Sequence, residues 1–189
     1  MDAVSQLVTI AAVVLGAVTT YVTNHLMERT KHRQTLLMRW DEKKLDAYAE
    51  YVGRVRRCIY AAVLLFEVRE GIRTIERSEH ELVLELAEAE GRRALAFERV
   101  MMLAGDQVIE AAHAVNKAAL AIDWRARGAV EGSLEGWRAL HTDVFAAINR
   151  FHQQARADLG VTGGFAGEEH TSRGLILPTA RVEETPEAD

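Results

Sequence analysis

The hydrophobic pattern of this chain begins with a long uncharged run. Residues 3–27 contain no Asp, Glu, Lys or Arg, and a helix over residues 3–24 is roughly 33 Å long, about the thickness of the hydrocarbon core of a bilayer. Threonines, Gln6 and Gly16 make the run less apolar than many spanning helices. We expect a transmembrane helix from Val4 to Thr23. An interfacial helix, a buried helix of a soluble protein and a cleaved signal are the alternatives.

Basic residues follow this run, and none precedes it. Arg29, Lys31 and Arg33 are the first of a group that extends to Lys44. Because lysine and arginine near a span favour the cytoplasmic side, we expect a single-pass protein of the cell membrane with a cytoplasmic C-terminal domain. The same cations can either contact anionic lipid headgroups or be solvated.

A stripe of small residues lies within the predicted membrane helix. Ala12, Gly16 and Thr20 recur at every fourth position, which places them on one face and lets two helices approach closely. The stripe predicts packing between membrane helices of a homo-oligomer. Chance is the alternative, because alanine, glycine and threonine are common in the chain.

An apolar seam with helical spacing follows. From Leu45 to Phe66 its members step by three and four positions, as on the buried face of an amphipathic helix. The seam consists of Leu45, Tyr48, Val52, Val55, Ile59, Ala62 and Phe66. No proline or glycine occurs between Tyr21 and Tyr51, so this helix can continue the membrane helix, with a break near residues 31–34 as the alternative.

Helix start and stop signals divide the following residues into three more amphipathic segments. Ser78 and Glu81 have the spacing of a capping box, which begins a helix. The pair Gly105-Asp106 reads as the end of that helix and the N-cap of a third, and a loop over residues 128–133 precedes a fourth from Leu134 to about Leu159. The expected buried face of this last helix carries Trp137, His141, Val144, Ile148, Phe151 and Ala155. Four consecutive helices with short connections most simply form an antiparallel bundle.

The C-terminal composition differs from that of the helices. Both prolines of the chain, Pro178 and Pro186, lie there, after a glycine-rich stretch and before an acidic end, which predicts a disordered tail. The expected fold is therefore all-α, with a transmembrane anchor over residues 1–28, a cytoplasmic bundle over residues 29–160 and a tail over residues 161–189. An apolar triplet in the tail, Leu175 to Leu177, either stays unstructured or docks on the bundle or a partner.

Charge and cysteine content narrow the class of protein. A net charge of -5 and a pI near 5.8 argue against nucleic acid as a partner, since binding to phosphates requires excess Lys and Arg. The single cysteine, Cys58, excludes an intramolecular disulfide. It lies within the apolar seam region and is expected to be a structural thiol.

Few residues have the spacing that catalysis or metal binding requires. Glu110 and His113 form one E-x-x-H unit, but a di-iron bundle needs a second such unit and further glutamates. His141 lies on the expected buried face of the last helix. We predict no catalytic, metal or cofactor-binding residue and no cofactor. Glu110, His113 and His141 are weak ligand candidates for the alternative function, a small-molecule-binding protein or enzyme that uses an inter-helix cavity.

One segment carries a family resemblance. Residues 39–48, RWDEKKLDAY, together with the apolar helix before them, resemble uncharacterised actinobacterial single-pass membrane proteins with R-W-D-x-K/R-K/R-L-x-A-Y after an N-terminal anchor. Residues 151–161 are similar to the end of that group's last helix. The resemblance implies the same architecture and, because no activity is established for the group, no catalytic residue.

These observations favour a non-enzymatic role. We expect a membrane-tethered cytoplasmic helical module for interaction or scaffolding, with the lipid bilayer, a cytoplasmic protein or a second copy of the chain as partners. A membrane-active effector that depends on the anchor alone is a further alternative.

Overall fold

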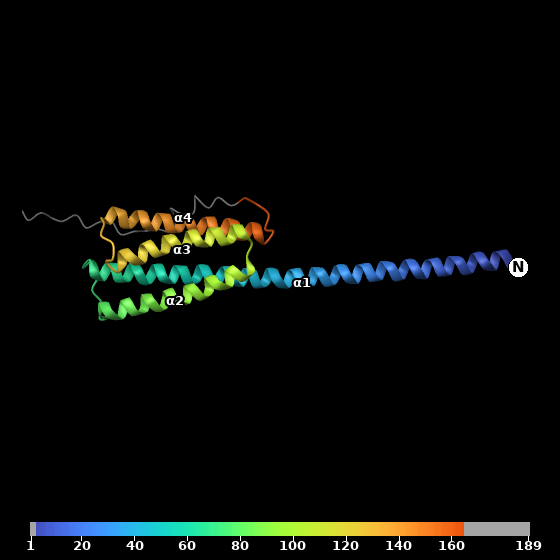
Figure 1. Cartoon of the computed structure of the whole chain (residues 1–189), viewed down its shortest axis with the longest axis horizontal. Helices are drawn as coiled ribbons and strands as arrows, with labels where there is room; N and C mark the ends of the chain where they lie inside the picture. Colours follow the sequence, from blue (N-terminus) through green and yellow to red (C-terminus); the bar gives the residue numbers. More distant parts are fainter. Residues whose placement is uncertain (1–2, 165–189) are drawn as a thin grey trace, which may run out of the picture. The chain divides into compact units, whose positions relative to one another are not determined.

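The structure, a computed structural model, describes residues 3–164, which form four α-helices and their connections (Figure 1). They are α1 (Ala3–Arg69), α2 (Glu79–Leu103), α3 (Asp106–Ala126) and α4 (Leu134–Asp158). No strand occurs among these residues, and the predicted all-α fold class is confirmed. The chain divides into two compact units, Met1–Lys43 and Lys44–Asp189, which are described one at a time. Helix α1 contributes to both and has no break at residues 31–34.

The first unit contains the N-terminal part of α1. The hydroxyls of Thr19, Thr20 and Thr23 each donate a hydrogen bond of 2.8 Å to the carbonyl four residues earlier, which satisfies them within the helix. Within residues 3–164, no helix is long and apolar enough to cross a membrane, so the transmembrane helix expected from Val4 to Thr23 is not supported. Threonine is frequent among the side chains described there, and it lowers the apolar character of the run.

Most side chains at the N-terminal end of α1 lie outside those described. Of the predicted packing stripe, Gly16 and Thr20 are described and exposed, whereas the side chain of Ala12 is not among those described. The side chains of the expected topology determinants, Arg29, Lys31 and Arg33, also lie outside them. The stripe and the orientation therefore stay predictions.

In the second unit, α1 runs antiparallel to both α4 and α2. Near its start Tyr48 meets the ring of Phe151 at 5.8 Å, and near its end Phe66 stacks on Trp137 at 4.0 Å between ring centroids. The ion pair of Arg69 with Glu79 at 3.2 Å lies at the end of α1 and the start of α2. Since these contacts join late residues of α1 to early residues of α2 and α4, both neighbours run in the opposite direction.

Helix α3 completes the bundle. It runs antiparallel to α2, because Phe97 contacts the ring of His113 at 5.0 Å and the earlier Arg93 contacts the later Asn116. It lies beside α4 in Figure 1, and Gly105 at its start donates a backbone hydrogen bond to Asp158 at the end of α4. The predicted helical bundle is confirmed, with neighbouring helices antiparallel.

The core lies between these four helices. Its largest fully buried side chains include Tyr51, Phe151, Leu65, Leu82, Leu86 and Ile122. All six residues on the expected face of the last helix are buried, and so is most of the seam of α1. Val52 is partly buried, and Leu45 is exposed over 55% of its surface. It lies level with the last turn of α4, at the edge of the bundle, where fewer neighbours can cover it.

Local signals begin and end the helices. The capping box is confirmed: the backbone N–H of Ser78 donates to the Glu81 carboxylate at 2.7 Å, and the N–H of Glu81 donates to the Ser78 hydroxyl at 3.3 Å. The expected Asp106 cap is wrong, because Gly105 is the N-cap of α3 and Asp106 already lies within the helix. The expected tail, including Leu175 to Leu177, falls from residue 165 onward outside the described residues.

Three glycines end helices in the left-handed conformation. Gly71, Gly128 and Gly160 have φ of 67°, 71° and 66°, values that side chains other than glycine rarely adopt. At α4 the N–H of Gly160 donates to Ala157 and that of Val161 to Arg156, at 3.1 and 2.9 Å. The same pattern of two hydrogen bonds ends α1 and α3. At each of these three ends the glycine stops the helix and the chain changes direction.

Candidate functional site

The three weak ligand candidates do not form one site. Glu110 and His113 are exposed on α3, and His113 rests its ring against Phe97. His141 is buried on α4, with 2% of its surface exposed. Among the described residues, no group of three His, Cys, Asp or Glu side chains could hold a metal ion.

His141 is held as a neutral side chain in the core. Its Nδ1 lies 2.9 Å from the carbonyl of Trp137, so Nδ1 carries the hydrogen and Nε2 is the acceptor. Burial lowers the pKa of His141 below its usual value, against the opposing effect of that hydrogen bond. Its Nε2 is buried without a hydrogen-bond partner among the described residues. Because a substrate cannot reach it there, this arrangement favours a structural role.

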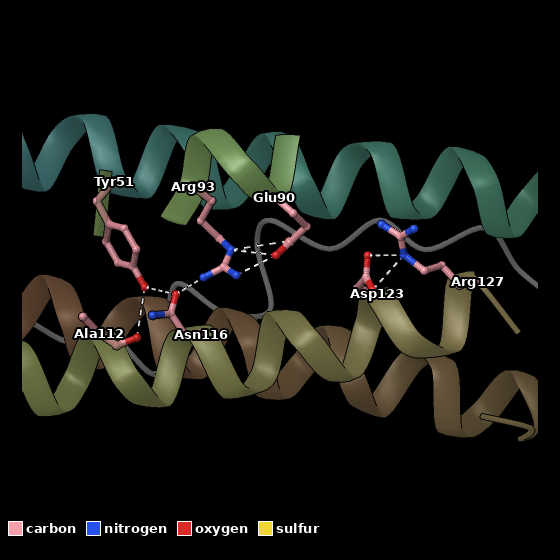
Figure 2. Close-up of polar contacts among 7 residues, drawn as sticks. All are labelled: Tyr51, Glu90, Arg93, Ala112, Asn116, Asp123 and Arg127. Atoms are coloured by element: carbon pink, nitrogen blue, oxygen red, sulfur yellow. Dashed lines mark hydrogen bonds and ion pairs between the residues drawn. The ribbon is translucent and has the colours of Figure 1, made fainter. Parts of the chain in front are cut away.

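A polar network inside the bundle joins three helices (Figure 2). The hydroxyl of Tyr51 on α1 lies 2.9 Å from the Ala112 carbonyl and 2.8 Å from Oδ1 of Asn116, both on α3. Arg93 on α2 donates to the same Oδ1 and forms an ion pair with Glu90 at 2.6 Å. We call Tyr51, Glu90, Arg93 and Asn116 the core network.

The core network keeps its charges because they are paired. The side chains of Arg93 and Glu90 are only 11% and 19% exposed. Burial alone would lower the pKa of Arg93, but the bonds with Glu90 hold it above its usual value. Burial raises the pKa of the Tyr51 hydroxyl, although the charge of Arg93 acts to lower it. The network therefore holds a guanidinium and a neutral phenol in fixed positions between α1, α2 and α3.

Cys58 lies close enough to this network to be affected by it. Burial, followed by the charge of Glu90 and a hydrogen bond with it, raises the pKa of the Cys58 thiol to about 12. A thiol with so high a pKa is almost entirely protonated near neutral pH and is a poor nucleophile. The geometry agrees with the structural thiol that the sequence predicts.

A second buried carboxylate lies at the end of α3. Asp123, of which 6% is exposed, accepts a hydrogen bond from the single Nε–H of Arg127, which lies 2.8 and 2.9 Å from its two carboxylate oxygens (Figure 2). Nearby, the guanidinium of Arg125 lies 5.3 Å from the centroid of the Phe66 ring. Cations at the last turn of a helix are favourable for its dipole, so this cluster needs no ligand to account for it.

The surface of the bundle offers an apolar groove between α1 and α4. Its volume is about 330 Å³. Apolar side chains make up most of its wall, namely Leu45, Tyr48, Ala49, Val52, Phe151, Ala155 and Leu159. We call it the α1/α4 groove. None of the three weak ligand candidates lines it.

One side chain of the groove wall, Tyr48, is held in place by polar partners outside the wall. The Tyr48 hydroxyl donates to Asp158 at 2.6 Å, and Lys44 forms an ion pair with the same carboxylate at 2.9 Å. Burial acts to raise the pKa of Asp158, but the hydrogen bonds from Tyr48 and Lys44 hold it below its usual value. The Tyr48 ring of the apolar wall is thus fixed by its hydroxyl, as in the largely preformed pockets that commonly bind apolar groups.

A second groove, between α1 and α2, is polar. Its volume is about 440 Å³, and it is lined by Glu50, Gly53, Arg54, Arg57 and Arg92. Arg54 pairs with Glu50 at 3.4 Å and Arg92 with Glu88 at 3.0 Å. Because neighbouring carboxylates already neutralise part of its charge, this groove is a weaker candidate for ligand binding than the α1/α4 groove.

Sequence reasoning missed both the core network and the groove. The residues of the network lie beside the predicted apolar seams, where an i,i+3 Glu-Arg pair is normally a solvated pair. The groove depends on where α4 ends relative to α1, which a single-helix pattern does not contain. The sequence places Leu45 on the buried seam, so it gave no signal that this residue lines a surface groove.

Comparisons of the chain with protein-family models, with curated proteins and with solved structures found no match. The fold and the two grooves define the class of protein as an all-helical bundle with an apolar surface groove.

Proposed function

We propose that this chain is a membrane-tethered helical interaction module whose α1/α4 groove binds an apolar segment of a partner protein. The observation that carries the proposal is the groove itself, an apolar hollow of about 330 Å³ on the surface of a well-packed bundle. Contiguous apolar hollows of this kind mark interaction sites more often than other parts of a protein surface.

Proximity labelling with a groove variant tests the interaction. Ala49 is exposed and lines the groove, so Ala49→Glu places a charge there without removing core packing. The matched control is Ala139→Glu, because Ala139 is exposed on α4 and does not line the groove. We expect the labelling of the most enriched partner to fall at least fivefold with Ala49→Glu and to stay unchanged with Ala139→Glu. Equal loss or equal retention in both variants rejects the proposed binding site.

The tether is the second part of the proposal, and the sequence supports it. The uncharged run over residues 3–27, the cations that follow it and the resemblance of residues 39–48 to single-pass membrane proteins all favour a membrane location with the bundle in the cytoplasm. Membrane fractionation after alkaline extraction tests the tether. The full chain should stay in the pellet, and a Val13→Arg/Val14→Arg chain should move to the supernatant. A wild-type chain that is extracted by alkali contradicts the tether.

Self-association through the small-residue stripe is a further part of this proposal. A Cβ added at Gly16 meets no described atom within 4 Å, so Gly16→Ile adds a side chain where the helix leaves open space. We expect crosslinked dimers in membranes to decrease severalfold, and Leu15→Ile is the control on a neighbouring position. Unchanged crosslinking with Gly16→Ile removes the stripe from the proposal.

A further inference from the structure

The α1/α4 groove lies where the chain leaves α4. Leu159, the C-cap of α4, and Arg156 line it. Gly160 then turns the chain, and the N–H of Val161 donates to the Arg156 carbonyl at 2.9 Å. This bond folds the chain back onto the last turn of α4, so Val161 is held next to Arg156, a residue of the groove wall.

The apolar triplet of the C-terminal segment is within reach. Leu175 follows Gly164, the last described residue, by 11 positions, and a flexible chain of that length has an end-to-end distance of roughly 18 Å. Its fully extended limit is roughly 36 Å. The wall of the groove from Leu45 to Val52 is about 10 Å long at the rise of an α-helix. The connection is therefore longer than the wall of the groove, and its length does not keep the triplet from the groove.

The triplet also has the chemistry that the groove requires. Leu175, Ile176 and Leu177 are the longest apolar run after Gly164. Pro178 follows it, and a residue before proline favours an extended backbone. In an extended segment alternate side chains lie on the same side, so Leu175 and Leu177 can enter together. The volume of about 330 Å³ is roughly twice the ~150 Å³ cavity that holds one benzene molecule.

We propose that Leu175 to Leu177 of the same chain occupy the α1/α4 groove and compete there with any partner. A tethered segment has an effective concentration in the millimolar range, so an intrinsic dissociation constant below that concentration is enough to fill the groove. This inference deepens the proposed function, because it gives the same groove an internal competitor. It does not need the partner to be identified.

Photo-crosslinking of the purified full chain tests the inference. The probe is p-benzoylphenylalanine in place of Ile176, the middle residue of the triplet, which is not among the described core residues. An equal mixture of unlabelled and ¹⁵N-labelled chains separates crosslinks within a chain from crosslinks between chains. We expect crosslinks within a chain to peptides that contain Ala49, Val52 or Ala155. Crosslinks to other surfaces, crosslinks mainly between chains, or no crosslink at all would overturn the inference.

Two groove variants control the experiment. Ala49→Trp fills the groove from an exposed position and should lower the yield of the crosslink at least fivefold. Ala139→Trp adds the same side chain to α4 outside the groove and should leave the yield unchanged. Equal yields in the two variants contradict docking in this groove.

Alkylation of a cysteine in the groove gives an independent measurement. In an Ala49→Cys chain, the native Cys58 is buried, so the reagent reports on position 49. Replacing Leu175 and Leu177 by Asp should raise the alkylation rate at least fivefold, and an unchanged rate counts against the inference. Both measurements use purified protein, so their failure is distinct from a failure to find a cellular partner.

Discussion

A buried guanidinium depends on its partners more than one on the surface does. Arg93 reaches α1 and α3 through Asn116 and Tyr51, and it pairs with Glu90 on its own helix. Removing one member of such a group leaves the others desolvated and unpaired, which costs far more than the loss of an exposed ion pair.

This contrast gives a first prediction. Arg93→Leu should lower the free energy of unfolding by about 3 kcal/mol, because Glu90 then keeps a buried charge without its partner. Arg54→Leu breaks the more exposed pair with Glu50 and should cost no more than about 0.5 kcal/mol. Denaturant titration of the two chains measures the difference. Equal losses of unfolding free energy in the two variants would show that the ion pair of Arg93 contributes no more than an exposed one.

Cys58 gives a second prediction at this scale. Its thiol is 3% exposed and has a pKa of about 12, so the native chain should not react with Ellman's reagent at pH 8 on the timescale of minutes. The chain in denaturant should release one equivalent of chromophore, which serves as the positive control. Rapid reaction of the native chain would show that the α1 seam opens around Cys58.

The core network also shows why sequence reasoning had limits at the residue scale. Tyr51, Glu90 and Asn116 are each one step away from an apolar seam position, and their pairing depends on the rotation of three helices about their axes. Periodicity predicts which face of a helix is buried, but not which polar residue at the border of that face meets a partner.

At the scale of elements, glycine has opposite roles in two places. Gly71 ends α1 with φ of 67°, whereas Gly91 lies inside α2, with no atom within 4 Å of an added Cβ. A left-handed backbone strains any residue with a Cβ, whereas inside a helix alanine is preferred to glycine.

The same substitution should therefore change stability in opposite directions. Gly71→Ala should lower the free energy of unfolding by about 1 kcal/mol, and Gly91→Ala should raise it by roughly 0.5–1 kcal/mol. Thermal unfolding of the two single variants beside the wild type measures both shifts. Shifts of the same sign would contradict the backbone argument.

The helices themselves were largely predictable from the sequence. Apolar periodicity predicts the buried faces of α1 and α4. Local start and stop signals, such as the capping box of α2, predict where helices begin and end. The end of α1 at Arg69 and the turn at Gly71 were not predicted, since the apolar seam stops at Phe66 and the loop that follows has no strong signal. The cap of α3 was misassigned because glycine and aspartate are both acceptable N-caps.

At the scale of the whole molecule, two histidines make stability depend on pH. Burial lowers the pKa of His141, and burial followed by the charge of Arg56 lowers that of His152. The folded chain therefore resists protonation of these rings more than the unfolded chain does. The free energy of unfolding should have its full value above the ordinary histidine pKa of about 6.5, and it should fall as the pH decreases below that value.

Denaturant titrations at pH 7.5 and 5.5 check this prediction. The wild-type chain should be less stable at pH 5.5, and a His141→Leu chain should lose part of that difference whatever its absolute stability. Asp158 does not interfere, because its lowered pKa means that its contribution is lost only below about pH 4. A wild-type chain that is equally stable at both values would contradict the prediction.

The bundle as a whole was predictable from the sequence, but its surface groove was not. The order and length of the helices favour antiparallel neighbours, and the contacts of Tyr48, Phe66 and Trp137 agree. The α1/α4 groove exists because α4 ends level with Leu45, a relation between two chain segments more than a hundred residues apart in sequence. A pattern within one helix does not fix that relation.

The core network has a consequence for the history of this sequence. Positions 51, 93 and 116 lie on three different helices, yet a change at one leaves a buried polar atom at the others. Substitutions there should be accepted together, as a polar set or as an apolar set, while the apolar seams drift independently. In an alignment of distant relatives, the residues at positions 51, 93 and 116 should therefore change together. That shared pattern should identify a relative more easily than overall sequence identity does.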